Sequence, residues 1–265
     1  MNRGLVSVIT PAYNSGRLIQ ETIGSVRAQT YRDWEMVVVD DCSTDGTREV
    51  LEREAGKDPR ITVASTGKNS GQAAARNLGM KVAKGRYLAF LDADDLWLPR
   101  KLERQVEFMR AKGSAFSFTS YRQISEDGKA VAGLIEIPGS LTYRSLLANA
   151  GIIGCLTVVL DRERLGAFEF QDIPREDFAL WLGLLRRGFT ADGLREDLAR
   201  YRVVTGSHSS NKIWAAVKTW DIIYNLEKTP LPFALWCFAR YGWKAFKRHR
   251  VLLMKGKPVP DSEGS

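Results

Sequence analysis

Three aspartates directly follow an apolar run in the segment LAFLDADDLWLP, Leu88–Pro99. Asp92, Asp94 and Asp95 repel one another when ionised, so a buried strand that ends with them requires a compensating partner. Carboxylates at positions i and i+2 can converge on one hard divalent cation, which prefers oxygen ligands and keeps open positions for a diphosphate. The alternative is an aspartate-rich turn that caps the helix beginning at Pro99. Spacing alone leaves both interpretations open.

Two more polar segments follow apolar runs: PAYN (Pro11–Asn14) and DDCSTDGT (Asp40–Thr47). Tyr13 offers an aromatic ring that could stack on a base, or it is a half-buried loop tyrosine. The two aspartates that open the second segment either contact a ligand or belong to a turn that caps the next helix. A phosphatase of the haloacid-dehalogenase type is excluded, because that chemistry needs an aspartate where this chain has Cys42.

Four β-rich apolar runs place these polar segments at strand ends. The runs are Leu5–Thr10, Glu35–Asp40, Ile61–Ser65 and Arg86–Asp92. Helical patterns separate them after Leu18, in Gln72–Ala83 and after Pro99. Strands too apolar to alternate, separated by helices, predict an α/β fold whose parallel sheet is covered on both faces. Ligands bind beyond the carboxyl ends of such strands, so the three polar segments are expected to face one crevice.

The second half of the sequence is less regular. Its expected elements are strands at Ala115–Tyr121 and Leu156–Asp161, a hairpin turn at Ser125–Gly128 and an amphipathic helix at Asp177–Arg187. The stretch Phe116–Asp172, where contacts that decide specificity are expected, carries no motif that identifies a substrate.

Length and composition narrow the class of protein. The 265 residues are 44% hydrophobic, which is enough for one large core or for a core with a small subdomain. Three cysteines without CxxC spacing indicate reduced thiols rather than disulfides or a zinc site, and they favour a cytoplasmic location. The N-terminus lacks the long apolar stretch of a signal peptide, and no run reaches the roughly 18 apolar residues of a membrane span.

The net charge of +8 is concentrated near the C-terminus. Seven Lys and Arg residues and no acid lie between Arg240 and Lys257, whereas the rest of the chain is nearly neutral. On a helical wheel of Pro232–Arg250, one side is apolar (Leu235, Phe238, Ala239, Gly242 and Phe246, flanked by Trp236 and Trp243) and the other is basic (Arg240, Lys244, Lys247 and Arg248). Such a helix fits the surface of an anionic membrane, or it packs on the domain with its basic face in solvent.

Four blocks of the sequence, in order, resemble family 2 of the inverting glycosyltransferases over about residues 4–210. They are VSVITPAYN, VVVDDCSTDGT, NSGQAAARNLGMKVAKGRYLAFLDADDLWLP and REDFALWLGLLRRG. The resemblance implies a GT-A fold, a Rossmann-like mixed sheet, mainly parallel, whose front half binds a sugar nucleotide. The expected organisation is a catalytic domain over 1–210 (nucleotide-binding half 1–112, acceptor half 113–210), a basic helical extension over 211–257 and a disordered tail over 258–265.

The resemblance also implies how a nucleotide-sugar donor is held. Pro11, Ala12 and Tyr13 border the nucleotide base, with Tyr13 stacked on it. Asp41 bonds the edge of the base, and Arg76 lies near the base or the phosphates. A uridine diphosphate sugar is the expected donor.

The same resemblance implies the reactive groups. Asp92, Ala93 and Asp94 match the DXD element, in which Asp92 and Asp94 bind Mn²⁺ or Mg²⁺ and Asp94 is the more direct ligand. Asp177, in the Glu176–Asp177 pair, matches the general base that takes a proton from the acceptor hydroxyl. One displacement from the opposite face then inverts the anomeric carbon. Without the resemblance, Asp177 reads as a helix N-terminal residue favoured by the helix dipole.

Histidine is scarce, with only His208 and His249 in the sequence. Many relatives place a histidine after the YR of a segment such as YRVVTGSHSS (Tyr201–Ser210), where this chain has Val204. His208 is therefore expected either to reach the metal or phosphate as a third ligand or to lie in a surface loop.

Two rival functions are a non-catalytic nucleotide- or glycan-binding protein and a sugar nucleotidyltransferase. The first need not keep a base such as Asp177, and the second usually begins with a Gly-rich basic loop, which TPAYNSGRL lacks. Nucleic acid is not expected as a partner, because the chain has no basic groove or nucleic-acid motif. Size and basic tail fit a bacterial enzyme of O-antigen-like or capsule-like surface polysaccharide synthesis. Its acceptor would be a glycan or a polyprenyl-diphosphate-linked saccharide, reached from the inner face of the cytoplasmic membrane.

Overall fold

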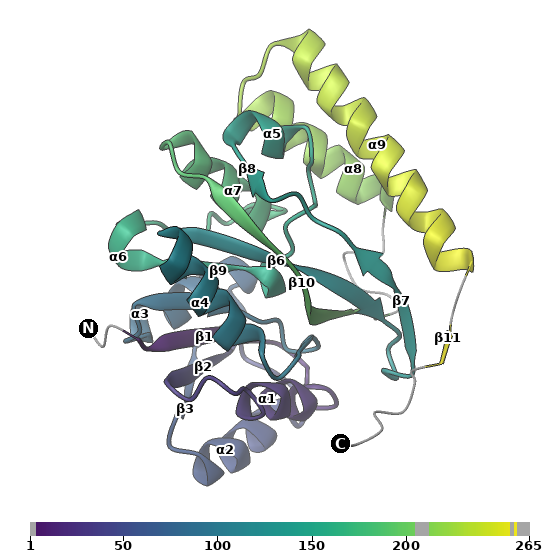
Figure 1. Ribbon diagram of the computed structural model, residues 1–265. Coiled ribbons are helices and arrows are strands. Elements are labelled where there is room, and N and C mark those ends of the chain that lie inside the picture. The colour runs from purple at the N-terminus through teal and green to yellow at the C-terminus, as the bar shows by residue number, and fades with distance from the viewer. Residues whose placement is uncertain (1–3, 205–211, 255–256, 259–265) are drawn as a thin grey trace.

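The polar segments predicted at strand ends belong to a sheet whose first four long strands are parallel (Figure 1). The computed structural model describes residues 4–204, 212–254 and 257–258. Strand β1 (Val6–Ala12) lies between β2 (Trp34–Asp40) and β4 (Tyr87–Phe90), and β3 (Ile61–Ser65) pairs with β2. The apolar side chains of β1, β2 and β4 are buried on both faces, as the unbroken apolar runs predicted.

Beyond β4 the sheet becomes mixed. Strand β9 (Val159–Asp161) pairs antiparallel with β4 and with β6 (Phe116–Ile124), and β6 pairs in parallel with β10 (Ala191–Arg202). The hairpin turn predicted at Ser125–Gly128 joins β6 to antiparallel β7 (Ala130–Ile135). Three short strands complete the sheet: β5 (Leu96–Trp97), β8 (Ser140–Leu141) and β11 (Lys257–Pro258). The predicted α/β fold class is confirmed.

Helices cover both faces of the sheet. Helices α1 (Ile19–Arg27), α2 (Thr47–Lys57) and α4 (Lys101–Lys112) bury apolar side chains on one face. Helices α3 (Gln72–Val82) and α7 (Glu176–Arg186) do so on the other face. Helix α3 approaches β1 so closely that a Cβ added at Gly79 would lie 2.6 Å from Ile9 Cγ2. Two short helices, α5 (Tyr143–Leu147) and α6 (Arg162–Leu165), lie in the connections.

Two elements differ from the sequence predictions. The stretch Leu156–Asp161 is not one strand, because the 3₁₀ helix η1 (Cys155–Thr157) precedes β9. The Thr157 hydroxyl donates to the Gly154 carbonyl at 2.6 Å and closes this turn. Strand β10 was not predicted, since its sequence ADGLREDLARYR lacks a regular apolar pattern; pairing with β5, β6 and β8 makes it a strand.

The C-terminal helices pack on the same side as α7 (Figure 1). Helix α8 (Lys212–Trp220) continues through the π-helical η3 (Asp221–Leu226) and leads to α9 (Leu231–Met254). The rings of Trp220 on α8 and Phe238 on α9 lie 5.4 Å apart, edge to face. Phe238 therefore packs inward, as one of the two alternatives for this helix expects, whereas Leu235 from the same apolar side is exposed. Across the described ranges, no helix has the length and apolar character needed to cross a bilayer.

Candidate active site

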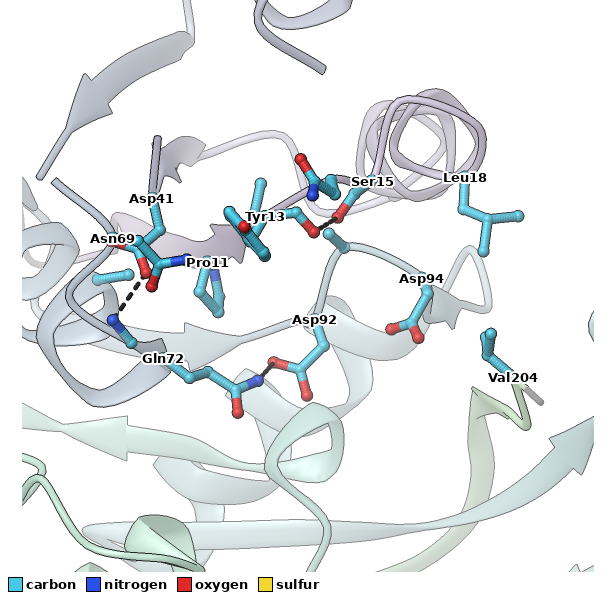
Figure 2. Close-up of a pocket in the computed structure, with 15 residues that line it drawn as sticks. Pro11, Tyr13, Ser15, Leu18, Asp41, Asn69, Gln72, Asp92, Asp94 and Val204 are labelled. Atoms are coloured by element: carbon cyan, nitrogen blue, oxygen red, sulfur yellow. Dashed lines mark hydrogen bonds between the residues drawn. The ribbon is translucent and has the colours of Figure 1, made fainter. Parts of the chain in front are cut away.

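A pocket of about 380 Å³ lies at the carboxyl ends of β1 and β4 (Figure 2). Seven residues singled out from the sequence line it: Pro11, Ala12, Tyr13, Asp41, Asp92, Ala93 and Asp94. The structure adds Asn14, Ser15, Leu18, Asn69, Gly71, Gln72, Ala75 and Val204. Parallel strands end at one edge of the sheet, so polar segments far apart in the sequence meet there.

The Asp41 carboxylate is fixed in the pocket wall by three donors. Its Oδ1 accepts hydrogen bonds from Thr66 Oγ1 at 2.6 Å and from the Ser70 amide at 2.9 Å. Its Oδ2 accepts one from the Gly71 amide at 2.7 Å. The backbone turns there with a φ of 85° at Gly71, which a side chain would disfavour. Tyr13 lines the same pocket and is 48% exposed, so its ring is accessible to a planar ligand.

Asp92 is held from the helix α3 side. Its Oδ1 accepts hydrogen bonds from Gln72 Nε2 at 3.2 Å and from Arg76 Nη2 at 2.6 Å (the Gln72 contact is drawn in Figure 2). The other terminal nitrogen of Arg76 pairs with the Glu176 carboxylate. Burial alone would lower the pKa of the Arg76 guanidinium, but the two carboxylates outweigh it and raise this pKa above its usual value. Arg76 is only 2% exposed and is not among the pocket-lining residues, so it contacts the pocket wall through Asp92.

Two carboxyl groups of the DADD segment, those of Asp94 and Asp95, have raised pKa values. Burial and the negative charge of Asp92 raise the pKa of Asp94 to about 6. Burial, followed by Asp94 and Asp92, raises the pKa of Asp95 well above its usual value. The segment is therefore a partly buried cluster of carboxyl groups whose ionised form an added cation would stabilise.

Arg202, at the end of β10, holds the DADD segment in place. Its backbone amide donates to Asp95 Oδ1 at 2.8 Å, and its Nε donates to the Asp94 carbonyl at 2.7 Å. Its Nη2 pairs with Glu21 Oε2 on α1 at 2.6 Å. Arg202 therefore joins the second half of the chain to the DADD segment and to α1. Arg202 was not predicted as a site residue; the only sign of it in the sequence is the YR pair in YRVVTGSHSS.

The donor set at Asp92 and Asp94 fits a hard divalent cation. Both side chains line the pocket and present only oxygen. Burial and, after it, the charge of Asp92 raise the pKa of Asp94, and a cation would favour the ionised form of both carboxyl groups. Within the described ranges, no group of three or more His, Cys, Asp and Glu side chains is placed to hold a metal. His208, the expected third ligand, lies outside the described residues. Protein ligands from the described residues would therefore leave several positions for water and a diphosphate.

Asp177 lies in the first turn of α7, and its Oδ1 accepts the Phe178 amide at 2.7 Å. A helix N-terminus favours a negative charge at this position. The neighbouring Glu176 pairs with Arg76, which in turn pairs with Asp92. One guanidinium therefore joins the pocket to the start of α7, although Arg76 and Glu176 are 100 positions apart. Glu176 was noted in the sequence only as the neighbour of Asp177, because spacing gives no sign of this bridge.

A model of the family described as "Glycosyl transferase family 2" matches residues 7–163, more than half of the chain. The chain belongs to glycosyl transferase family 2. Among members of family 2, the putative teichuronic acid biosynthesis glycosyltransferase TuaG of Bacillus subtilis is 49% identical over 92% of this chain and 97% of its own. The Escherichia coli UDP-Glc:alpha-D-GlcNAc-diphosphoundecaprenol beta-1,3-glucosyltransferase WfgD is 38% identical over 97% of this chain and 100% of its own.

Solved structures show the same fold. The mannosyltransferase PcManGT of Pyrobaculum calidifontis, in complex with GDP-Man and Mn²⁺, aligns with a TM-score of 0.67 and 23% identity, covering 96% of this chain and 75% of its own. S. aureus TarS in complex with UDP-GlcNAc aligns with a TM-score of 0.66 and 21% identity, covering 83% of this chain and 65% of its own. The family 2 chain thus has the GT-A fold expected from its sequence, and it is a glycosyltransferase.

Proposed function

We propose that this glycosyltransferase transfers a sugar, with inversion, from a uridine diphosphate sugar to a hydroxyl of a lipid-linked saccharide in bacterial surface polysaccharide synthesis. The observation that carries the proposal is the Asp92–Arg76–Glu176 bridge. It fixes the donor pocket and the start of α7 relative to one another, and Asp177 follows Glu176 directly. The relatives TuaG and WfgD, whose names give teichuronic acid and a diphosphoundecaprenol-linked sugar, support the substrate classes.

In this proposal the pocket holds the nucleotide. Tyr13 stacks on the base, and Asp41, oriented by Thr66 and its neighbours, accepts from the base edge. Asp92 and Asp94 would hold Mg²⁺ or Mn²⁺, and His208, outside the described residues, would be either a further ligand or a residue of a surface loop. The bound cation would neutralise the diphosphate and stabilise charge on the leaving group.

Asp177 performs the proton transfer. Its carboxylate takes the proton of the acceptor hydroxyl while the acceptor oxygen forms a bond to the anomeric carbon. The bond from that carbon to the diphosphate oxygen breaks on the opposite face, and uridine diphosphate leaves. A single in-line displacement of this kind inverts the anomeric configuration.

The first test replaces the base. Asp177→Asn should lower kcat by about 10²–10⁴-fold, because base catalysis is lost, while the donor still binds. Initial rates are measured as released uridine diphosphate with a lipid-linked saccharide as acceptor. Asp172→Asn, an exposed carboxylate shortly before α7, is the control. Turnover of Asp177→Asn within a few-fold of wild type would remove Asp177 from the proposal, and release of pyrophosphate would indicate a nucleotidyltransferase.

The second test removes the cation ligand. Calorimetry should show that Mn²⁺ or Mg²⁺ strengthens uridine diphosphate binding to the wild-type protein, since a cation held by Asp92 and Asp94 would offset the negative charge of the diphosphate. Asp94→Ala should abolish this enhancement, whereas Asp127→Ala, in the exposed β6–β7 turn, should retain it. Equal affinity with and without metal in the wild type would contradict the proposed metal dependence.

We also propose that the C-terminal segment docks the enzyme on the inner face of the cytoplasmic membrane, where a polyprenyl-diphosphate-linked acceptor would lie. Exposed apolar side chains gather on α8 and α9, among them Ile213, Leu235, Trp236 and Trp243. The basic run from Arg240 to Lys257 follows directly in the sequence. Exposed tryptophans beside concentrated positive charge are typical of a surface that binds anionic lipid.

A further inference from the structure

Arg175, the residue directly before the Glu176–Asp177 pair, has an unusual backbone conformation. It is the N-cap of α7 and adopts φ 61° and ψ 43°, in the left-handed region. Residues other than glycine rarely adopt this conformation, and it persists only where the surroundings hold it. The turn that presents Asp177 is therefore set by contacts of Arg175.

Those contacts come from the C-terminal helices. Arg175 Nη1 donates to Thr219 Oγ1 on α8 at 2.7 Å, and it lies 3.5 Å from Tyr241 Oη on α9. Thr219 is buried, and its own hydroxyl proton is donated to the Ala215 carbonyl at 2.7 Å. Its oxygen is thus free to accept from the guanidinium. The guanidinium carbon also lies 5.8 Å from the centre of the Phe178 ring and 5.9 Å from that of Tyr241.

The start of α7 is consequently held from two directions. Arg76 binds Glu176 from the donor side, and Arg175 binds α8 and α9 from the other side. Asp177 lies directly after both attachment points. We propose that Arg175 is a positioning residue for Asp177, and that α8 and α9 contribute to catalysis by holding Arg175. This inference rests on the proposed role of Asp177 as the base.

If Arg175 had a purely structural role, its substitution would change the melting temperature rather than kcat. Arg187, at the other end of α7, donates to the Ala167 carbonyl at 3.1 Å and also to the Leu165 carbonyl. It ties the same helix to a loop in a comparable way, but far from Asp177. If such ties only stabilise the fold, substitutions of Arg175 and Arg187 will lower the melting temperature and leave kcat unchanged.

The deciding variant is Arg175→Gly, because glycine keeps the left-handed turn without strain and removes only the side-chain tie. The expected loss in kcat for transfer is about 10- to 100-fold, the effect of a small misplacement of a catalytic group. The donor KM and the metal-dependent affinity for uridine diphosphate should stay within about two-fold of wild type, because the pocket is untouched. Arg187→Gln is the matched control and should keep the wild-type kcat.

Thr219→Val removes the hydrogen bond between Arg175 and Thr219 from the α8 side. It replaces Arg175→Gly as the test if that variant fails to fold. It should lower kcat in the wild-type background and cost nothing further in the Arg175→Gly background, since both changes break one interaction. A wild-type kcat in Arg175→Gly, or additive losses in the double variant, would overturn the inference. If Asp177→Asn is inactive while Arg175→Gly is fully active, only the positioning role fails. If Asp177→Asn is active, the proposed base fails and this inference fails with it.

Discussion

The buried guanidinium of Arg76 pairs with two carboxylates, that of Asp92 in the pocket and that of Glu176 at the start of α7. Its planar fork allows this, whereas the ammonium of lysine is a point charge that cannot reproduce both bonds. Arg76→Lys should therefore leave a buried carboxylate without its partner. We expect the free energy of unfolding to fall by about 3–5 kcal/mol, the usual cost of breaking a buried ion pair. Urea denaturation followed by circular dichroism measures the change.

An exposed arginine provides the comparison for this residue. Arg104 pairs with Glu196 at 2.7 Å, but the two side chains are 39% and 33% exposed. Water solvates both charges there, so Arg104→Lys should lower the free energy of unfolding far less than Arg76→Lys does. Similar losses in the two variants would show that the Arg76 bridge is not the buried link described above.

For single residues, the sequence predicted the pocket aspartates better than the arginines that hold them in place. Asp41, Asp92 and Asp94 were found because they directly follow apolar strands, and strand ends meet at one edge of the sheet. Arg76 binds the Asp92 carboxylate, and Arg202 binds the Asp95 carboxylate and the Asp94 carbonyl, both from distant positions in the sequence. Arg76 was expected near the base or phosphates. A position on a helix does not tell which buried carboxylates its side chain will meet, so these roles required the structure.

At the scale of elements, prediction succeeded where local pattern and tertiary packing agree. The parallel strands and helices α3, α4 and α7 follow the predicted runs closely, since apolar periodicity determines both their conformation and their buried face. Strand β10 was missed because its partners, rather than its own pattern, make it a strand. For α9 a helical wheel separated the apolar side from the basic side but left its packing open, because the contact of Phe238 with Trp220 depends on where α8 lies.

The exposed apolar side chains of α9 and the basic residues that follow them in the sequence lead to a prediction about membranes. Reversing the charge of Lys244, Lys247 and Arg248 should release the protein from anionic vesicles, since each basic residue near such a surface contributes about 1 kcal/mol. Replacing Trp236 and Trp243 by glutamine should weaken the binding that remains at high salt, which depends on apolar burial. Co-sedimentation at low and high salt measures both effects.

The control for these variants is an exposed basic residue on α2, at the other end of the molecule from α9 (Figure 1). The Arg53 side chain is 51% exposed, and Arg53→Glu should leave vesicle binding unchanged. Hydrolysis of the donor by water should also persist in the charge-reversed variant, because the pocket is untouched. Equal sedimentation of wild type and all variants, or no preference for anionic lipid, would assign the segment to packing alone.

At the scale of the whole molecule, the donor pocket depends on both halves of the chain. Residues 1–112 supply the three aspartates of the pocket, whereas Arg202 and Val204 come from the end of the second half. A separately expressed 1–112 fragment should therefore show no metal-enhanced binding of uridine diphosphate by calorimetry. Adding the 113–265 fragment should restore it if the halves associate. Full binding by 1–112 alone would show that Arg202 is dispensable for the pocket.

The contact between Arg202 and the DADD segment also affects the order in which the chain can fold during synthesis. Asp95 and Arg202 are 107 positions apart, so a ribosome finishes the acidic segment long before it makes the residue that holds it. Until then the growing chain carries clustered carboxylates whose burial is unfavourable. We therefore expect the segment to stay hydrated during synthesis and to become buried only after β10 pairs with β6. The pocket wall formed by this segment would then be complete only when most of the polypeptide has been made.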